Sequence, residues 1–315
     1  MNRTYTLMAV AIGLLLVSAG CAGGAEPDAL RIGVLPILDA LPMFVAEQQG
    51  AFDQYGVEVE FVSAASAAER DQLLQAGKID GFITDLVALA LYNREAPRVS
   101  AVRYAMTPTP SFAQFRVMAA RESGISKPED LVGVEIGISE GTVIEYVTDR
   151  MLEAEGLSPA EIETLAVPKI PERMALLRSG ELDAATLPEP LGSLVMQDGA
   201  VVVVDDTHHT ETSCSVYAFR REALERSPEA VRSFLRAVSQ ASEAINEDKD
   251  RWSSLLTEEN LVPEPLMGSY ELPNYPRDET PSRAQFADAV AWLQETGRIS
   301  GAPSYADSVD ASFLP

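Results

Sequence analysis

One short pattern occurs twice in this chain, starting at residue 73 and again at residue 176. The first copy reads Leu-Leu-Gln-Ala-Gly-Lys-Ile-Asp-Gly and the second Leu-Leu-Arg-Ser-Gly-Glu-Leu-Asp-Ala. Each copy is typical of a helix end, a glycine just beyond it and a short strand. Because the glycine and the aspartate fall in register, we interpret the copies as one α/β unit built twice rather than as chance recurrence. Two similar lobes would leave a cleft between them, where small ligands usually bind.

Strands and helices alternate along the rest of the sequence. Apolar runs and alternation predict strands at residues 30–36, 57–61, 79–84, 99–104, 134–138, 165–168, 182–187, 201–204 and 215–219. Capping residues and glycine stops predict helices at residues 39–49, 66–76, 85–93, 141–155, 171–179, 228–245 and 282–297. This alternation indicates parallel sheets covered by helices. We expect lobe I to comprise residues 30–110 and 213–315, with lobe II, residues 111–212, inserted between them.

The amino-terminal residues predict export. Arg3 precedes an apolar run at residues 7–17, which is too short to span a bilayer of roughly 30 Å. The run ends in Ser-Ala-Gly-Cys21, small residues before a cysteine, as in a bacterial lipobox. We therefore expect a lipoprotein signal peptide at residues 1–20, a lipid on the Cys21 thiol and a flexible tether at residues 21–29. An ordinary secretory signal with a chance cysteine is the alternative.

The composition fits an exported two-domain protein. The chain has 24 basic and 48 acidic residues, a net charge of −24, which argues against nucleic acid or anionic lipid surfaces as partners. Its hydrophobic content of 46% is that of a globular protein, and no other segment is long and apolar enough to cross a membrane. If Cys21 is lipidated, Cys214 has no cysteine partner and no disulfide forms.

Several segments resemble one transport family in the same order along the chain. They are residues 30–36, 41–47, 50–61, 77–81, 130–138 and 180–184. In these segments the chain is similar to substrate-binding proteins of ABC transporters of the nitrate/sulfonate/taurine type, a family that includes thiamine-pyrimidine binding proteins. The resemblance covers nearly all of the chain after the tether, and it leaves the ligand undetermined.

The resemblance implies an α/β, type II periplasmic-binding-protein fold, with mostly parallel sheets in two lobes. It implies a monomer outside the cytoplasmic membrane that closes on a small ligand and delivers it to an ABC permease and its ATPase. Whether that location is a periplasm or a Gram-positive surface, and which permease takes part, stay open.

A candidate binding site follows from the fold. In open parallel sheets, ligands bind outside the carboxyl ends of the strands, beside helix N-termini. Five loops satisfy this rule, and their candidate ligand-binding residues are Asp39, Ala40, Ser63, Ser66, Thr84, Asp85, Ser139, Gly141, Thr142 and Glu189. Each hydroxyl could by itself be a plain helix cap. The stronger prediction is that these loops face one cleft.

The charges in these loops constrain the ligand. Asp39, Asp85, Glu140 and Glu189 are acidic, and the five loops contain no Lys or Arg. A bare inorganic anion such as nitrate therefore fits less well than a ligand with an anionic end and an amine, such as taurine, or a neutral to basic heterocycle. Alternatively, the carboxylates only cap helices. Arginines elsewhere that could reach the site are Arg70, Arg103 and Arg116.

The sequence predicts no catalytic, metal or cofactor site. His208 and His209 are adjacent, so on a strand they would point to opposite faces and chelate poorly. There is no Walker-type loop, no Cys/His metal spacing and no Gly-x-Ser-x-Gly turn. An enzyme on the same fold, as in the thiamine-pyrimidine synthase branch, is an alternative, although the Cys-rich segment of that branch is missing. A lipid-tethered sensor domain is another.

Overall fold

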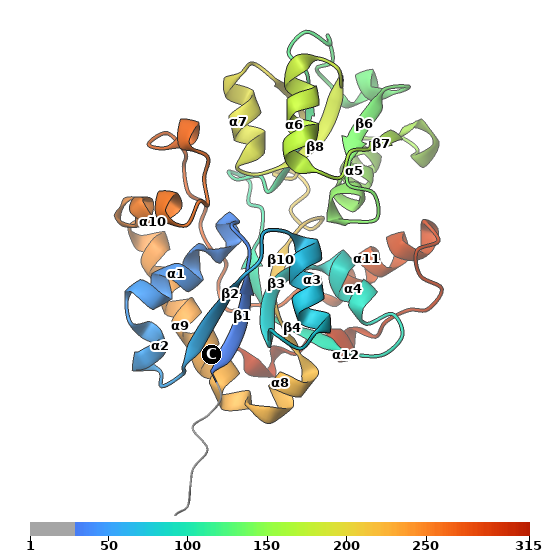
Figure 1. The fold of residues 1–315 in the computed structure, drawn as a ribbon. Coiled ribbons are helices and arrows are strands. Elements are labelled where there is room, and N and C mark those ends of the chain that lie inside the picture. Colours follow the sequence, from blue (N-terminus) through green and yellow to red (C-terminus); the bar gives the residue numbers. More distant parts are fainter. Residues whose placement is uncertain (1–28) are drawn as a thin grey trace, which may run out of the picture.

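The computed structural model describes residues 29–315, which form two five-stranded sheets (Figure 1). The strands of the first sheet are β1 (Leu30–Val34), β2 (Val59–Ser63), β3 (Gly81–Asp85), β4 (Val99–Met106) and β10 (Ser215–Arg220). Those of the second are β5 (Phe115–Ala119), β6 (Glu135–Ile138), β7 (Glu163–Ala166), β8 (Ala184–Pro188) and β9 (Val201–Asp205). We call the body around the first sheet lobe I and the body around the second lobe II.

Helices cover both sheets. In lobe I they are α1 (Leu41–Gln48), α2 (Ala51–Gln54), α3 (Ala67–Gln75), α4 (Leu86–Tyr92), α8 (Arg221–Arg226), α9 (Pro228–Glu247), α10 (Ser253–Glu258), α11 (Arg283–Glu295) and α12 (Tyr305–Ser308). In lobe II they are α5 (Val143–Ala154), α6 (Ile170–Ser179) and α7 (Leu191–Gln197). None of the helices in residues 29–315 is both long and apolar enough to cross a membrane.

The two sheets share one plan. Their strand orders are β2-β1-β3-β10-β4 and β7-β6-β8-β5-β9. In the first sheet β10 runs antiparallel to both neighbours, and in the second β5 does the same, while the other strands run one way. The predicted α/β fold with mostly parallel sheets is confirmed. The chain passes between the sheets after β4 and after β9; the lobe boundaries by residue number stay a prediction.

The repeated sequence pattern marks equivalent turns in the two lobes. Gly77 follows α3 with φ +65°, and Gly180 follows α6 with φ +75°, a left-handed conformation that side chains disfavour. The two repeated aspartates differ in role. Asp80 is 1% exposed and accepts hydrogen bonds from the guanidinium groups of Arg31 and Arg226, whereas Asp183 is exposed.

A second pair of glycines allows each repeat to pack closely. A Cβ atom at Gly33 in β1 would lie 2.7 Å from Ile79 Cδ1, and one at Gly137 in β6 would lie 2.4 Å from a methyl group of Leu182. Ile79 and Leu182 are the aliphatic residues of the two repeats and are both buried. Each glycine therefore makes room for the turn that follows the repeated helix.

The lobes are packed against each other on one flank. One hydrophobic cluster contains Leu89 of α4, Val147 of α5 and Trp292 of α11, so its side chains come from both lobes. Polar contacts line the same seam, because Trp292 Nε1 donates to Asp149 at 2.7 Å. Figure 1 shows α11 beside α4 and below α5. Lobe II is thereby held to lobe I at α5 as well as by the two chain crossovers.

Candidate ligand-binding junction between the lobes

Two predicted carboxylates lie at the edge of lobe I that faces lobe II. Asp39 lies in the 3-10 turn Leu38–Ala40 after β1, and Asp85 ends β3. Ser215, the first residue of β10, is the register partner of Asp85, and its hydroxyl donates to Asp39 Oδ1. The fold thus brings Asp39 and Asp85 to either side of one serine, as the strand-end rule predicts.

Neither carboxylate forms a salt bridge within the described residues. No Lys, Arg or His nitrogen of residues 29–315 lies within 4.0 Å of either one. Burial raises the pKa of Asp39 above its usual value, and burial also raises the pKa of Asp85. Asp85 Oδ1 accepts from Ala88 N at 2.9 Å as the N-cap of α4. The cap accounts for one oxygen of Asp85, and the nearby Arg70 charge partly counteracts the effect of burial on the Asp85 pKa, although no cation of the described chain contacts either carboxylate.

The other predicted residues of lobe I occupy different settings. Ala40 is fully buried, and Thr84 is buried with no hydrogen-bond partner for Oγ1 within the described chain. Ser63 ends the edge strand β2 and is exposed. Ser66 is also exposed and accepts from Glu69 N at 3.2 Å as the N-cap of α3. Ser66 therefore has the role of a helix cap, and the unpaired Thr84 hydroxyl is the better candidate for contact with a ligand.

The predicted residues of lobe II form one loop before α5. Thr142 is the N-cap of α5, where its hydroxyl accepts from Ile144 N at 3.2 Å and donates to Ser139 O at 2.7 Å. Ser139 is buried, and its hydroxyl donates to Pro168 O at 3.2 Å. Gly141, at φ +75°, completes the turn. Ser139, Gly141 and Thr142 therefore act together as one turn.

This loop meets lobe I through an arginine that the sequence did not indicate. Arg298 follows α11, and its guanidinium contacts Glu145 at 2.6 Å and Glu140 at 3.7 Å. A Cβ atom at Gly141 would lie 3.2 Å from the same guanidinium. Gly141 N donates to Glu145 Oε2 at 2.5 Å. Gly141 N and Ile144 N are thus both hydrogen-bonded to side chains of this segment and are not free to bind a ligand.

Glu189, the remaining predicted residue, is held by several partners. Its side chain is 4% exposed and forms an ion pair with Arg116 of β5. It also accepts from Ser193 Oγ at 2.6 Å and from the Tyr270 hydroxyl at 3.2 Å. Of the three arginines that the sequence analysis named as able to reach the site, Arg116 therefore does reach the junction. Arg70 and Arg103 form their ion pairs with Asp71 and Asp278, although the Arg70 charge also acts on Asp85.

A buried cation lies beneath the lobe II loop. Arg173 is 0% exposed, and its guanidinium donates to Ser139 Oγ at 2.9 Å, Val167 O at 2.8 Å and Thr186 O at 3.0 Å. Its Nη2 has no partner in the described chain, and no carboxylate there lies within 4.0 Å. Burial lowers the pKa of Arg173 to about 10. An uncompensated positive charge is thus buried at the carboxyl ends of β6 and β7.

The repeat shows that this arrangement is particular to lobe II. Arg70 and Arg173 are each the fourth residue of the repeated helix, and each donates to the carbonyl of the third residue of the following strand, Ile83 O and Thr186 O. In lobe I the next residue, Asp71, accepts from Arg70 at 2.8 Å; in lobe II that position is Met174. Arg173 could have been found in the sequence by extending the alignment of the two copies three residues upstream.

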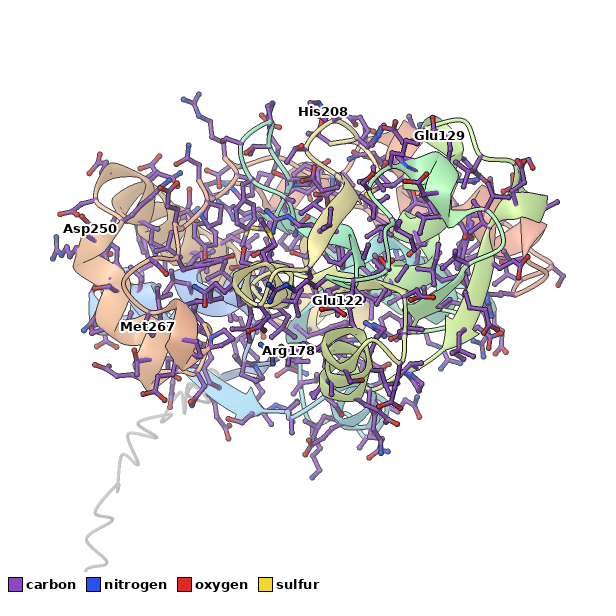
Figure 2. All side chains as sticks on the ribbon, turned by 90° about the horizontal axis from the view of Figure 1, so that it is seen from above. Glu122, Glu129, Arg178, His208, Asp250 and Met267 are labelled. Carbon is purple, nitrogen blue, oxygen red and sulfur yellow. The ribbon has the colours of Figure 1, made fainter. Side chains whose placement is uncertain are left out.

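Other features of the described residues lie away from this junction. A cavity of about 410 Å³ lies at the opposite end of the first sheet, between α3, α4 and α8, and contains none of the predicted residues. No three His, Cys, Asp or Glu side chains within residues 29–315 are close enough to hold a metal ion. His209 contacts Glu155 at 2.7 Å, and His208 is exposed at the edge of the molecule (Figure 2).

Comparisons with known proteins agree with this architecture. The chain is 22% identical to the nitrate/nitrite binding protein NrtA of a Nostoc species over 246 residues, 72% of this chain and 56% of the relative. It is 23% identical to the taurine-binding periplasmic protein of Escherichia coli over 192 residues, 60% of this chain and 58% of the relative. The chain thus spans less than two thirds of the length of these relatives.

A solved structure shows the same fold over most of the chain. The periplasmic aliphatic sulphonate binding protein SsuA from Escherichia coli matches with a TM-score of 0.73 at 20% identity, covering 89% of this chain and 96% of that one. The two-lobed α/β fold is therefore that of periplasmic binding proteins. A sequence profile of the NMT1-like family matches residues 23–255, well over half of the 315 residues, and the chain belongs to that family.

Proposed function

We propose that this protein is the extracytoplasmic solute-binding component of an ABC importer, and that its ligand is a small organic molecule with an amine at one end and an acid group at the other. The single observation that supports this ligand class is the separation of unpaired charges. Within the described chain neither Asp39 nor Asp85 of lobe I forms a salt bridge, although the Arg70 charge acts on Asp85 at longer range, and Arg173 of lobe II forms no salt bridge either.

Physical chemistry favours a ligand that fills both positions. Buried charges are stable when paired and hydrogen-bonded, and an unpaired one carries a large desolvation penalty. An ammonium group beside Asp39 and Asp85 would offset the lobe I charges. A sulfonate or carboxylate beside Ser139 would be stabilised by Arg173 and by the amino end of α5. A bare anion such as nitrate would satisfy only the second position.

We also propose that the ligand closes the lobes about the two crossovers, near residues 108–111 and 206–213. Asp206 supports this hinge, because its carboxylate accepts from Gln114 N at 2.9 Å and Phe115 N at 3.1 Å on the first crossover and from Ser213 Oγ on the second. One buried side chain thus joins both connections. Only a ligand with higher affinity for the closed form shifts the population toward it.

A thermal-shift series tests the ligand class. Taurine, an alkanesulfonate of equal length, an alkylamine of equal length, a pyrimidine and nitrate are each added to the purified protein at matched ionic strength. A ligand that binds only the folded state raises the melting temperature, and at equal concentration a tighter ligand raises it more. We expect the largest rise with taurine-like compounds and closure, seen as a smaller radius of gyration in solution scattering. A larger rise with nitrate or with the simple sulfonate would contradict the proposal.

Attachment to the membrane is the second part of the proposal. Cys21 and the preceding signal lie outside the described residues, and the lipobox-like sequence supports lipidation there. A Cys21→Ser variant is expected to move from the membrane fraction to the soluble fraction or to remain unprocessed. Unchanged processing and membrane attachment would show that Cys21 carries no anchor.

The setting of Cys214 supports a binding protein over a thiol enzyme. Cys214 is buried, and burial together with the nearby Asp85 charge raises the pKa of its thiol well above the usual value. A thiol becomes nucleophilic as the thiolate, so this environment suppresses reactivity.

A further inference from the structure

A segment of lobe I crosses to lobe II on the flank opposite α5 and α11. We call residues 263–275 the strap; it begins after α10 and includes the 3-10 turn η5 (Glu264–Leu266). Figure 1 shows the chain after α10 rising beside α7, and Figure 2 shows Met267 at that side of the molecule. Leu266 of the strap and Leu194 of α7 are buried in one hydrophobic cluster. The strap therefore packs on lobe II while its chain belongs to lobe I.

The lower end of the strap is fixed to lobe I. The Tyr275 hydroxyl donates to Leu38 O at 2.7 Å, and Tyr275 exchanges backbone hydrogen bonds of 2.7 and 2.9 Å with the Asn246 side chain of α9. Tyr275 is buried. Leu38 directly precedes Asp39, so the strap is anchored to the loop that carries one of the unpaired carboxylates.

The upper end of the strap makes one polar contact with lobe II, at a predicted site residue. The Tyr270 hydroxyl donates to Glu189 Oε2 at 3.2 Å. Glu189 cannot follow Tyr270 if the lobes separate, because Arg116 and Ser193 hold the carboxylate within lobe II. The Glu189 carboxylate also packs closely against Gly192, because a Cβ atom at Gly192 would lie 2.9 Å from Glu189 Oε1. Opening of the lobes on this flank therefore requires the Tyr270–Glu189 hydrogen bond to break.

We propose that Tyr270 and Glu189 form a latch that holds the lobes together, and that the latch controls how fast a bound ligand leaves. The sequence analysis selected Glu189 as a ligand contact. In this proposal Glu189 instead affects the ligand by holding the two lobes closed around it. The seam at α5 and α11 stays in place while the strap flank opens. The effect on ligand release rests on the proposed function; the effect on the lobes themselves does not.

The first test needs no ligand. Tyr270→Phe keeps the ring and removes the donor, and Tyr55→Phe is the matched control, because the Tyr55 hydroxyl donates to Gln240 at 3.0 Å within lobe I. Hydrogen exchange is measured by mass spectrometry on peptides covering residues 263–275 and 189–197. We expect exchange in both segments to be about tenfold faster in Tyr270→Phe, since a hydrogen bond to a charged acceptor is lost, and unchanged in Tyr55→Phe. Equal exchange in wild type and Tyr270→Phe would overturn the latch.

The second test uses taurine as the probe in stopped-flow binding. Tyr270→Phe is expected to release taurine about tenfold faster while its association rate changes little, and Tyr55→Phe is expected to match the wild type. Unchanged release in Tyr270→Phe would contradict the control of release by the latch. Failure of the wild type to bind taurine would contradict the proposed ligand, and the exchange measurement would then decide the latch alone.

Discussion

Arg70 and Arg173 occupy the same position in the two repeats, yet within the described residues Arg70 contacts a carboxylate and Arg173 contacts none. Asp71 neutralises Arg70 within its own helix, whereas Met174 leaves Arg173 without such a neighbour. Both copies of the repeat thus contain the buried arginine, but only the first copy contains an aspartate beside it. The arginine of the second copy, Arg173, therefore has no carboxylate partner in its own helix. This difference makes the two arginines a matched pair for mutagenesis.

Replacing each arginine by methionine is expected to separate ligand binding from stability. Both variants lower the melting temperature, because buried carbonyl groups lose their donors. Arg173→Met is also expected to weaken taurine binding by tens-fold or more, since loss of one partner of a buried charge-assisted contact costs about 2–5 kcal/mol. Arg70→Met is expected to change the affinity of the folded protein much less, because Arg70 acts on the site only through its longer-range interaction with Asp85. Calorimetry and thermal denaturation check this, and equal affinity losses in both variants would contradict the role of Arg173.

Asp85→Asn tests whether the Asp85 carboxylate does more than cap α4. Asparagine is as good an N-cap as aspartate, so the hydrogen bond to Ala88 N and the stability are expected to persist. The charge is lost, and the affinity for a ligand with an amine is expected to fall at least tenfold. Ser282→Ala is the control, because it removes the N-cap of α11 and about 1 kcal/mol of stability without touching the junction. Wild-type affinity in the Asp85→Asn variant would show that Asp85 acts only as a helix cap.

The packing of the first repeat is tested by a double-mutant cycle. Gly33→Ala is expected to destabilise the protein by about 1–3 kcal/mol, because its methyl group would lie 2.7 Å from Ile79 Cδ1. Ile79→Val removes that atom, so Gly33→Ala is expected to cost at least about 1 kcal/mol less in the Ile79→Val background. Urea denaturation of the four proteins measures the difference. Strict additivity would mean that the two side chains do not compete for the same space.

The α5–α11 seam contains a carboxylate whose titration is expected to affect stability. Burial raises the pKa of Asp149 to about 6, and Asp149 Oδ2 accepts from Trp292 Nε1 at 2.7 Å. A folded-state pKa above the unfolded value means that the folded state favours the protonated form. The associated stability is present below the unfolded value of about 4 and is lost as the pH rises through about 6.

Asp149→Asn keeps an acceptor for Trp292 and removes the charge. The variant is therefore expected to be more stable than the wild type at pH 7, by at most about 2–3 kcal/mol, since one pKa unit corresponds to about 1.4 kcal/mol. The difference is expected to vanish near pH 4. Thermal denaturation between pH 4 and pH 7 measures this stability difference. A difference between Asp149→Asn and the wild type that does not change with pH would show that the Asp149 charge is not destabilising.

The sequence predicts those parts of the fold that have strong local signals. Ser66, Asp85 and Ser282 each cap the helix that they were expected to begin, and Thr142 caps the helix that was expected to begin at residue 141. The predicted strands omit β5, although it lies between β8 and β9 in the second sheet. Its five residues, Phe115–Ala119, include one β-branched side chain and a charged Arg116, so its pairing is decided by β8 and β9 rather than by its own pattern.

The parts of the candidate site that lie at strand ends could be predicted from the sequence. The side chains that distant segments contribute could not. Asp39 and Asp85 lie at the carboxyl edge, as expected from their positions after β1 and β3. Tyr270 reaches the junction from the strap and Arg298 from the segment after α11, and no local motif marks either. Their roles depend on tertiary packing between segments more than eighty residues apart in the sequence.

The position of β10 has a consequence for the order in which the molecule can fold. β10 lies between β3 and β4, but it begins at residue 215, after every strand of the second sheet. A chain that emerges amino end first therefore has all of the lobe II strands, which end at residue 205, before it can complete lobe I. Until then β3 and β4 have open edges in the first sheet, and such edges invite wrong pairing. The half of the protein that appears first in the sequence is thus the last to close, and its unfinished sheet is the surface that a chaperone would have to shield.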